Sequence, residues 1–171
     1  DGVELDVQRT RDGILVVTHD EKLKRVTGDL RTVEEVSFAE IRQMNAAAYL
    51  PHLQPEIIPT LEEVLDVLGP SRLTINLELK NSVIRYPGME EQVLELVARK
   101  GLEDRMLYSS FNHQSIAELR SLGSPSRLAL LFKLRGVALE RAVRGKGVAA
   151  VHPFHRALRS SREVRQCHDA G

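Results

Sequence analysis

The chain has 171 residues, 42% of them hydrophobic, so it is long enough for one globular core and too short to indicate two. Its 24 Lys and Arg residues balance 24 Asp and Glu residues, which argues against nucleic acid or an anionic membrane surface as the main partner. No run approaches the roughly 18 apolar residues of a membrane-spanning helix. The single cysteine, Cys167, excludes an intrachain disulfide and permits a reducing compartment, so we expect a cytoplasmic location.

Short apolar runs alternate with helical periodicity along the chain, which is typical of an α/β fold with a mostly parallel sheet. The predicted strands are Val3–Val7, Ile14–His19, Leu73–Leu79, Arg105–Ser109, Arg127–Leu131 and Val148–Val151. The predicted helices are Ser37–Met44, Thr60–Leu68, Met89–Lys100, Gln114–Leu122, Val137–Gly145 and Ser160–Asp169.

The first two predicted strands are joined by little more than Thr10–Gly13, which is too short for a parallel crossover. We therefore expect an antiparallel hairpin, in which Thr10 faces Ile14 and His19 comes beside Leu5. The face that His19 takes stays open at this point, because a slip of one residue would invert it. From Lys22 to Pro59 we expect only one short helix and a long loop, and we interpret this region as a small insertion.

Three acidic residues interrupt strands that are otherwise apolar: Glu4, Asp6 and Glu78. Strand periodicity puts Glu4 and Asp6 on one face, and likewise Asn76, Glu78 and Lys80 on one face. An ionised carboxylate that is buried without a partner is costly, and a divalent metal held by three carboxylates would compensate it. Hard oxygen ligands favour Mg²⁺ or Ca²⁺ over zinc. The alternatives are that the acids face solvent on a half-exposed sheet or pair with arginines.

Other polar residues stand at the ends of predicted strands. An imidazole such as His19, beside a metal and a phosphate, suits general acid or base catalysis, whereas an isolated histidine there is more often an ordinary surface residue. Lys80 is able to hold a phosphate oxygen or to extend into solvent. The segment Ser109–Asn112 offers groups that would converge on an anion, or Asn112 simply caps the next helix.

Six segments, in this order and spacing, together indicate a family. They are Val3–Gly13, Val16–Arg25, Ile58–Leu65, Ile75–Lys80, Ser109–Asn112 and Val151–Pro153. In these segments the chain resembles the glycerophosphodiester phosphodiesterase family. The resemblance implies a TIM-type (β/α) barrel with residues 22–59 as a small insertion over its mouth. It also implies hydrolysis of small-molecule glycerophosphodiesters to an alcohol and glycerol 3-phosphate, with a bound divalent cation, Mg²⁺ or Ca²⁺.

The resemblance also assigns residues to roles. Carried over position by position, Glu4, Asp6 and Glu78 resemble the metal ligands. His19 resembles a catalytic histidine, and Lys80 resembles a contact to the substrate phosphate. The family begins with a strand ending in His-Arg-Gly, which supplies a second catalytic histidine, and closes with a strand reading Trp-Thr-Val-Asn or similar; the sequence contains neither.

A closed barrel of this type has eight strands and roughly 250 residues, against six predicted strands here. We therefore expect residues 1–171 to be a single catalytic-type domain that is truncated at both ends, and we expect this segment alone to have little or no diesterase activity. Two alternatives stay open: a related barrel phosphodiesterase that acts on a lysophospholipid or phosphoinositide, and a catalytically inert barrel used for binding or assembly.

Overall fold

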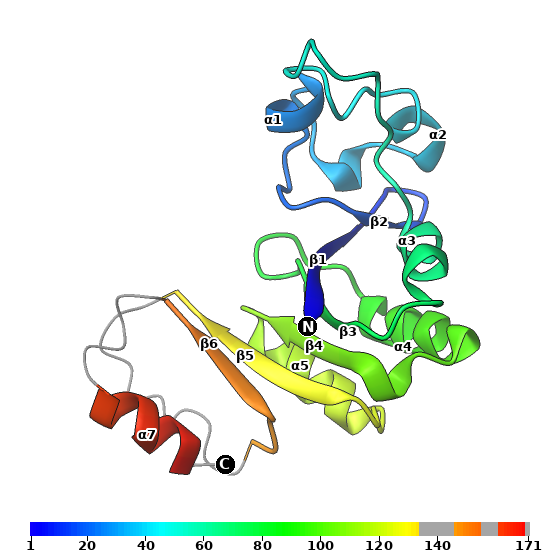
Figure 1. The fold of residues 1–171 in the computed structure, drawn as a ribbon. Coiled ribbons are helices and arrows are strands. Elements are labelled where there is room, and N and C mark those ends of the chain that lie inside the picture. Colours follow the sequence, from blue (N-terminus) through cyan, green and yellow to red (C-terminus); the bar gives the residue numbers. More distant parts are fainter. Residues whose placement is uncertain (134–145, 155–160, 170–171) are drawn as a thin grey trace.

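The computed structural model describes residues 1–133, 146–154 and 161–169. Its centre is a six-stranded sheet in the order β2-β1-β3-β4-β5-β6 (Figure 1). The strands are β1 (Gly2–Arg9), β2 (Leu15–Val17), β3 (Thr74–Leu79), β4 (Met106–Ser110), β5 (Arg127–Phe132) and β6 (Ala150–Pro153). Only β1 and β2 pair antiparallel; the other neighbours are parallel, which confirms the predicted α/β sheet.

The helices α3 (Leu61–Leu68), α4 (Met89–Lys100) and α5 (His113–Ser121) cover one face of this sheet. The 3-10 turn η2 (Glu103–Arg105) precedes β4, and the helix α7 (Ser161–Asp169) follows β6 in the chain. The predicted helix Val137–Gly145 lies outside the described residues. Gly101 and Gly123 follow α4 and α5 with φ of 64° and 79°, the left-handed conformation that a glycine adopts easily at a helix end.

The β1–β2 hairpin has the predicted register. Val7 pairs with Val17 and Arg9 with Leu15, and the Thr10 amide donates to the Ile14 carbonyl oxygen at 2.9 Å. The second strand is shorter than the predicted Ile14–His19, because the chain turns away after Val17. Beyond Val17, the side chain of Gln8 on β1 provides some of the hydrogen bonds that a longer β2 would have made.

The two faces of the sheet differ in character because strand side chains alternate. Leu77, Tyr108 and Leu130 point toward α3, α4 and α5 and are at most 1% exposed in the main hydrophobic core. The residues between them point to the opposite face. The register places Asp6, Glu78, Ser109, Ala129 and Ala150 in one row across that face, from β1 to β6.

Residues 22–59 form a separate packing unit beyond the β1–β2 hairpin (Figure 1). The prediction of one short helix was wrong: this region has α1 (Lys24–Thr27), the 3-10 turn η1 (Val33–Glu35) and α2 (Phe38–Ile41). Each is too short to show a periodicity in the sequence. Their apolar side chains gather in a second core of Val16, Leu23, Val33, Val36, Ile41 and Ile58.

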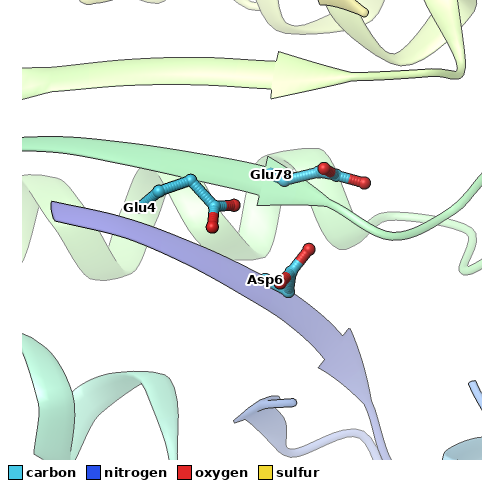
Figure 2. Close-up of side chains that lie close together, drawn as sticks. All are labelled: Glu4, Asp6 and Glu78. Atoms are coloured by element: carbon cyan, nitrogen blue, oxygen red, sulfur yellow. The ribbon is translucent and has the colours of Figure 1, made fainter. Parts of the chain in front are cut away.

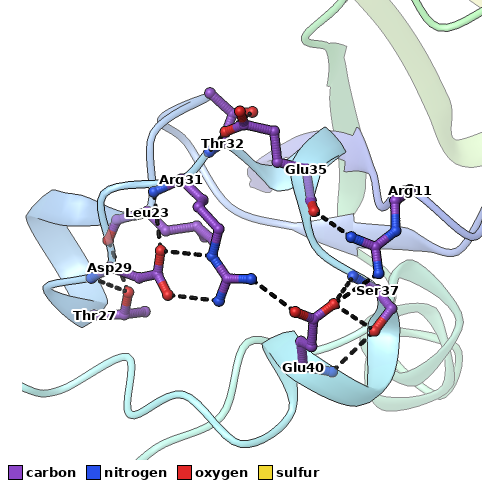
Figure 3. A network of polar contacts seen from close by, with 9 residues as sticks. All are labelled: Arg11, Leu23, Thr27, Asp29, Arg31, Thr32, Glu35, Ser37 and Glu40. Carbon is purple, nitrogen blue, oxygen red and sulfur yellow. Dashed lines mark hydrogen bonds and ion pairs between the residues drawn. The ribbon is translucent and has the colours of Figure 1, made fainter.

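Capping boxes and ion pairs fix this region to the hairpin (Figure 3). Glu40 forms a capping box with Ser37 at the start of α2, and it also binds Arg11 of the hairpin turn at 2.9 Å and Arg31 at 2.7 Å. Arg31 in turn pairs with Asp29 at 2.8 Å. The backbone amide of Arg11 donates to the carbonyl oxygen of Val36 at 2.9 Å, so the turn and the region are joined by main chain as well.

Candidate metal centre

Three carboxylates meet at the neighbouring strands β1 and β3. Glu4 and Asp6 are two residues apart on β1 and share a face, and Glu78 lies directly opposite Asp6 in the parallel register. One oxygen from each carboxylate lies within 4.8 Å of the others, and Figure 2 shows the side chains turned toward a common space. The structure therefore brings together the three acidic residues that the sequence singled out.

Lys80 lies against two of these acids. Its Nζ atom is 3.3 Å from Oε1 of Glu78 and 3.6 Å from Oδ1 of Asp6. The three side chains are only 11–12% exposed, so the ammonium group compensates charges that water reaches poorly. Lys80 therefore does not extend into solvent, which was one of the two interpretations of the sequence. Its contact with a substrate phosphate stays a prediction.

The single ammonium group of Lys80 does not balance the negative charge of the three carboxylates. Burial raises the pKa of Glu4 above its usual 4.5, and the neighbouring Asp6 and Glu78 raise it further. Burial also raises the pKa of Glu78, which Lys80 opposes and Asp6 reinforces. Raised carboxyl pKa values mean that the charged forms are disfavoured, and a bound cation would relieve this.

The donor set fits a hard divalent cation. Carboxylate and amide oxygens are the ligands that Ca²⁺ and Mg²⁺ take in proteins, and the acids present them from two adjacent strands. Asn76 lies opposite Glu4 on β3, and its Oδ1 atom is buried without a hydrogen-bond partner among the described residues. A buried acceptor without a partner is costly, so a cation or its water would also satisfy this oxygen.

His19 lies at the edge of the cluster with an exposed ring. Its Nδ1 atom is 2.6 Å from Oδ1 of Asp20, and its positive form would lower the pKa of both Glu4 and Glu78. A hydrogen bond from Arg25, aided by His19, lowers the pKa of Asp20 to about 2. An ionised Asp20 only accepts hydrogen bonds, so Nδ1 of His19 is the donor and Nε2 is left to face a ligand.

The sequence prediction missed Gln8, which lies on the same face of β1 as Glu4 and Asp6. It is fully buried, and its Nε2 atom donates to the carbonyl oxygens of Thr18 at 2.9 Å and Asp20 at 2.8 Å. The period of two along β1 was the signal that could have drawn attention to it. Its partners lie in an irregular segment, so their contacts could not be read from the pattern.

A buried polar network behind β3 and β4 was also missed. Glu90 of α4 is 1% exposed and accepts a hydrogen bond from Asn81 at 2.7 Å and another from Ser115. Ser110 donates to the side-chain oxygen of Asn81 at 3.2 Å. Asn81 directly follows Lys80, so the network fixes the end of the strand that carries Glu78 and Lys80. In the sequence, Glu90 looked like an ordinary acid in the first turn of a helix.

A cavity of about 740 Å³ opens where β3 and β4 end. Its walls are Asn81, Ser82, Val83, Arg85, Phe111, Asn112, His113 and Gln114. Asn112 caps α5, as the simpler interpretation predicted, because its side-chain oxygen accepts from the Gln114 amide at 3.2 Å. Among these lining residues Arg85 is the fixed charge and none is acidic. Because Arg85 also pairs with Glu118 at 3.4 Å, the cavity suits neutral polar groups best.

No helix in the described part of the chain combines the length and the apolarity that a membrane crossing needs. The predicted cytoplasmic location stays a prediction.

Comparison with known proteins gives a consistent family assignment. Residues 1–171 match the glycerophosphoryl diester phosphodiesterase family. The chain is 44% identical to a glycerophosphodiester phosphodiesterase of Bacillus altitudinis over 133 residues, which cover 77% of this chain and 54% of the relative. It is 34% identical to a glycerophosphodiester phosphodiesterase of Caldanaerobacter subterraneus over 160 residues, which cover 93% of this chain and 60% of the relative.

A solved structure agrees with these relatives. A phosphodiesterase of Oleispira antarctica in complex with the product sn-glycerol-3-phosphate superposes with a TM-score of 0.81 and 26% identity, covering all of this chain and 70% of that one. The chain thus spans between about half and two thirds of the length of the curated relatives it matches. Structures of the family are TIM barrels, and the described strands form an open part of such a sheet. The chain belongs to the glycerophosphoryl diester phosphodiesterase family.

Proposed function

We propose that the intact protein hydrolyses glycerophosphodiesters to an alcohol and glycerol 3-phosphate, with a divalent cation held by Glu4, Asp6 and Glu78. The observation that carries this proposal is the meeting of three carboxylates within 4.8 Å on adjacent strands. Membership of the family and the likeness to a structure that holds glycerol 3-phosphate support it. The cation, Mg²⁺ or Ca²⁺, would neutralise charge on the phosphate and make the attacking hydroxyl more acidic.

The residues of the chain would divide the remaining work. Either a water molecule would attack phosphorus, or the glycerol 2-hydroxyl would attack it and form a cyclic phosphate that water then opens to glycerol 3-phosphate. In both cases the nucleophile loses its proton to solvent, the bond from phosphorus to the alcohol oxygen breaks, and His19 donates a proton to that oxygen. The Asp20 carboxylate holds Nδ1 of His19 at 2.6 Å, so Nε2 is the nitrogen that delivers the proton. Lys80, near the end of β3, would hold a phosphate oxygen once a cation has taken its place beside the acids.

Two neighbouring regions would complete the site. The cavity at the ends of β3 and β4 would accept the alcohol part of the substrate, because its wall contains the residue that follows Lys80. Its lack of lining acids favours an uncharged polyol alcohol over the positively charged choline. Residues 22–59, held to the hairpin through Arg11 and Glu40, would form the predicted insertion over the mouth of the barrel.

The test uses the intact gene product with Mg²⁺, with Ca²⁺, and with neither after chelation. Release of the head-group alcohol from glycerophosphoglycerol, glycerophosphocholine, lysophosphatidylcholine and glycerophosphoinositol would be measured side by side. We expect turnover that requires the cation and is faster for the polyol diesters than for the choline diester. Turnover of only the lysophospholipid would assign the protein to the related activity instead, and binding without turnover would indicate an inert barrel.

A variant series assigns the roles of the residues. His19→Ala should lower kcat by about 10²- to 10⁴-fold, which is the usual contribution of general acid catalysis, and leave cation binding unchanged. Arg85→Glu should move the preference toward glycerophosphocholine, because it places a negative charge in the cavity wall. Arg99→Glu, the same change at the far end of α4, should leave the preference as it was. Equal preferences in both variants would remove the cavity from the proposal.

A further inference from the structure

Gln8 holds three consecutive peptide groups of the segment that carries His19. Its Nε2 atom lies 2.9 Å from the carbonyl oxygen of Thr18, 3.3 Å from that of His19 and 2.8 Å from that of Asp20. Its Oε1 atom accepts a hydrogen bond from the hydroxyl of Tyr86 at 3.4 Å. Every polar atom of this fully buried amide is therefore in use.

These contacts replace the sheet at the place where it ends. The last ladder pair of the hairpin joins Val7 and Val17, and one further main-chain bond runs from the Thr18 amide to the Asp6 carbonyl oxygen at 3.0 Å. Beyond this bond, the side chain of Gln8 hydrogen-bonds residues 18–20 to β1. The side chain of Gln8, two residues from Asp6 on the same strand, therefore sets the position of His19 relative to Asp6.

We propose that Gln8 is a positioning residue that holds His19 at the proton-donating distance from the substrate. This inference rests on the proposed function, because it assumes that His19 protonates the leaving oxygen. The imidazole ring itself is exposed, and Asp20, whose carboxylate lies 2.6 Å from its Nδ1 atom, belongs to the same segment that Gln8 holds. Gln8 thus holds the backbone of His19 and the backbone of Asp20, whose carboxylate orients the His19 ring.

The chemistry of an amide suits this role better than that of other side chains of the same size. A glutamate would bring carboxylate oxygens against the carbonyl oxygens of Thr18 and Asp20, and a leucine would leave both without this donor. Tyr86 decides which end of the amide points to the carbonyls, because its hydroxyl donates to Oε1. Burial raises the pKa of Tyr86 to about 12, so this hydroxyl keeps its proton.

A positioning role and a purely structural role differ in one measurable respect. An alkyl alkoxide needs a proton as it leaves, whereas a nitrophenolate leaves without one. A displaced His19 should therefore slow cleavage of an alkyl diester and spare cleavage of a nitrophenyl diester. A general loss of folded protein would lower both rates by the same factor.

The experiment measures kcat and KM of the intact gene product, with saturating cation, for glycerophosphocholine and for the p-nitrophenyl ester of glycerol 3-phosphate. Gln8→Leu should lower kcat for the choline diester roughly 10- to 100-fold, the size that orienting partners contribute in metal sites, with KM and cation affinity little changed. The rate for the nitrophenyl ester should be nearly that of the unaltered protein. Tyr86→Phe should show the same pattern with a smaller loss, and it carries the test should Gln8→Leu not fold.

Val93→Ala is the matched control, because Val93 is fully buried in α4 and truncation there lowers stability without touching this segment. It should affect both substrates equally. Equal losses on both substrates in Gln8→Leu and Tyr86→Phe, or no loss in either, would overturn the inference while leaving the proposed function intact. Insensitivity of His19→Ala to the leaving group would overturn the role of His19 and the inference together.

Discussion

The Nζ atom of Lys80 lies 3.3 Å from Oε1 of Glu78, two residues along the same strand. The ammonium group also lies 3.6 Å from Asp6, so it stands beside two of the three carboxylates that we assign to the cation. Lysine and cation would thus compete for the same negative charge. Binding of the cation would free Lys80 for the proposed contact with the phosphate, so the contacts of Lys80 should depend on whether the cation is bound.

Replacing Lys80 with methionine should lower the stability of the metal-free protein by roughly 1–3 kcal/mol, because it leaves buried charge without its partner. The rise in melting temperature on adding Mg²⁺ or Ca²⁺ should become larger in this variant. Lys100→Met is the matched control, since Lys100 bridges two more exposed acids, Glu62 and Asp66. Its loss of stability should be much smaller than that of Lys80→Met, because solvent screens exposed ion pairs, and its response to cation should be unchanged. An unaltered cation response in Lys80→Met would contradict this competition.

Glu78→Gln should abolish detectable binding of Mg²⁺ and Ca²⁺ in calorimetric titration, because the amide keeps the shape of the side chain and removes its charge. Glycerophosphodiester turnover should fall with it. Glu91→Gln, an exposed position on α4, should bind as the unaltered protein does. Full cation binding by the Glu78 variant would show that the ligands lie elsewhere.

The pH dependence of folding stability and of cation binding follows from the raised pKa values of Glu4 and Glu78. In the unfolded chain both acids titrate near 4.5, and in the metal-free folded protein they take up protons at higher pH. Over that window the folded state binds more protons than the unfolded state, so these two groups lower stability as the pH rises. A cation needs the ionised acids, so its stabilising effect should shrink as the pH falls from neutral toward the ordinary carboxyl pKa of 4.5.

Melting temperatures with and without cation across this range provide the measurement. Subtracting the same series for Glu78→Gln removes the contributions of carboxylates elsewhere in the chain. A cation effect that stays constant or grows toward acid pH would refute the assignment of the raised pKa values to the metal site.

The buried network behind the site should be costly to break. Glu90→Ala removes the acceptor for Asn81 and Ser115 and should lower the unfolding free energy by about 1–3 kcal/mol for each group left unsatisfied. Glu91→Ala, one residue along and exposed, should change it by no more than about 0.5 kcal/mol. Urea denaturation of both variants checks this, and equal stabilities would show that the network contributes nothing.

Much of the fold could be predicted from the sequence, for identifiable reasons. The short turn from Thr10 to Gly13 sets the hairpin register, and period-two alternation puts Glu4 and Asp6 on one face. The pairing of Asp6 with Glu78 is different. Asp6 and Glu78 are 72 positions apart in the sequence, so no turn fixes their register. The cost of burying carboxylates made a shared metal one of several interpretations, and the resemblance to the family assigned these acids to one site.

What escaped prediction depends on contacts rather than on patterns. The period of two puts Gln8 on the same face of β1 as Glu4 and Asp6, but its role does not follow from that pattern, because its partners are main-chain carbonyls of an irregular segment. The helix α2 lies within the predicted helix Ser37–Met44 but is shorter, whereas α1 was missed because four residues are too few for a periodicity of 3.6 to appear. The second core depends on residues as distant as Val16 and Ile58, which only the folded chain brings together.

Glu40 has a further consequence for how acid acts on this protein. Hydrogen bonds from Ser37, followed by the bond from Arg31, lower its pKa to about 2, whereas Glu4 and Glu78 accept protons above their ordinary value. As the pH falls, Glu4 and Glu78 would be protonated first. Glu40, which links Arg11 to Arg31, would be protonated only at much lower pH. Mild acid should therefore strip the cation from a protein whose 22–59 region is still docked, and restoring neutral pH should reload a site that never lost its shape.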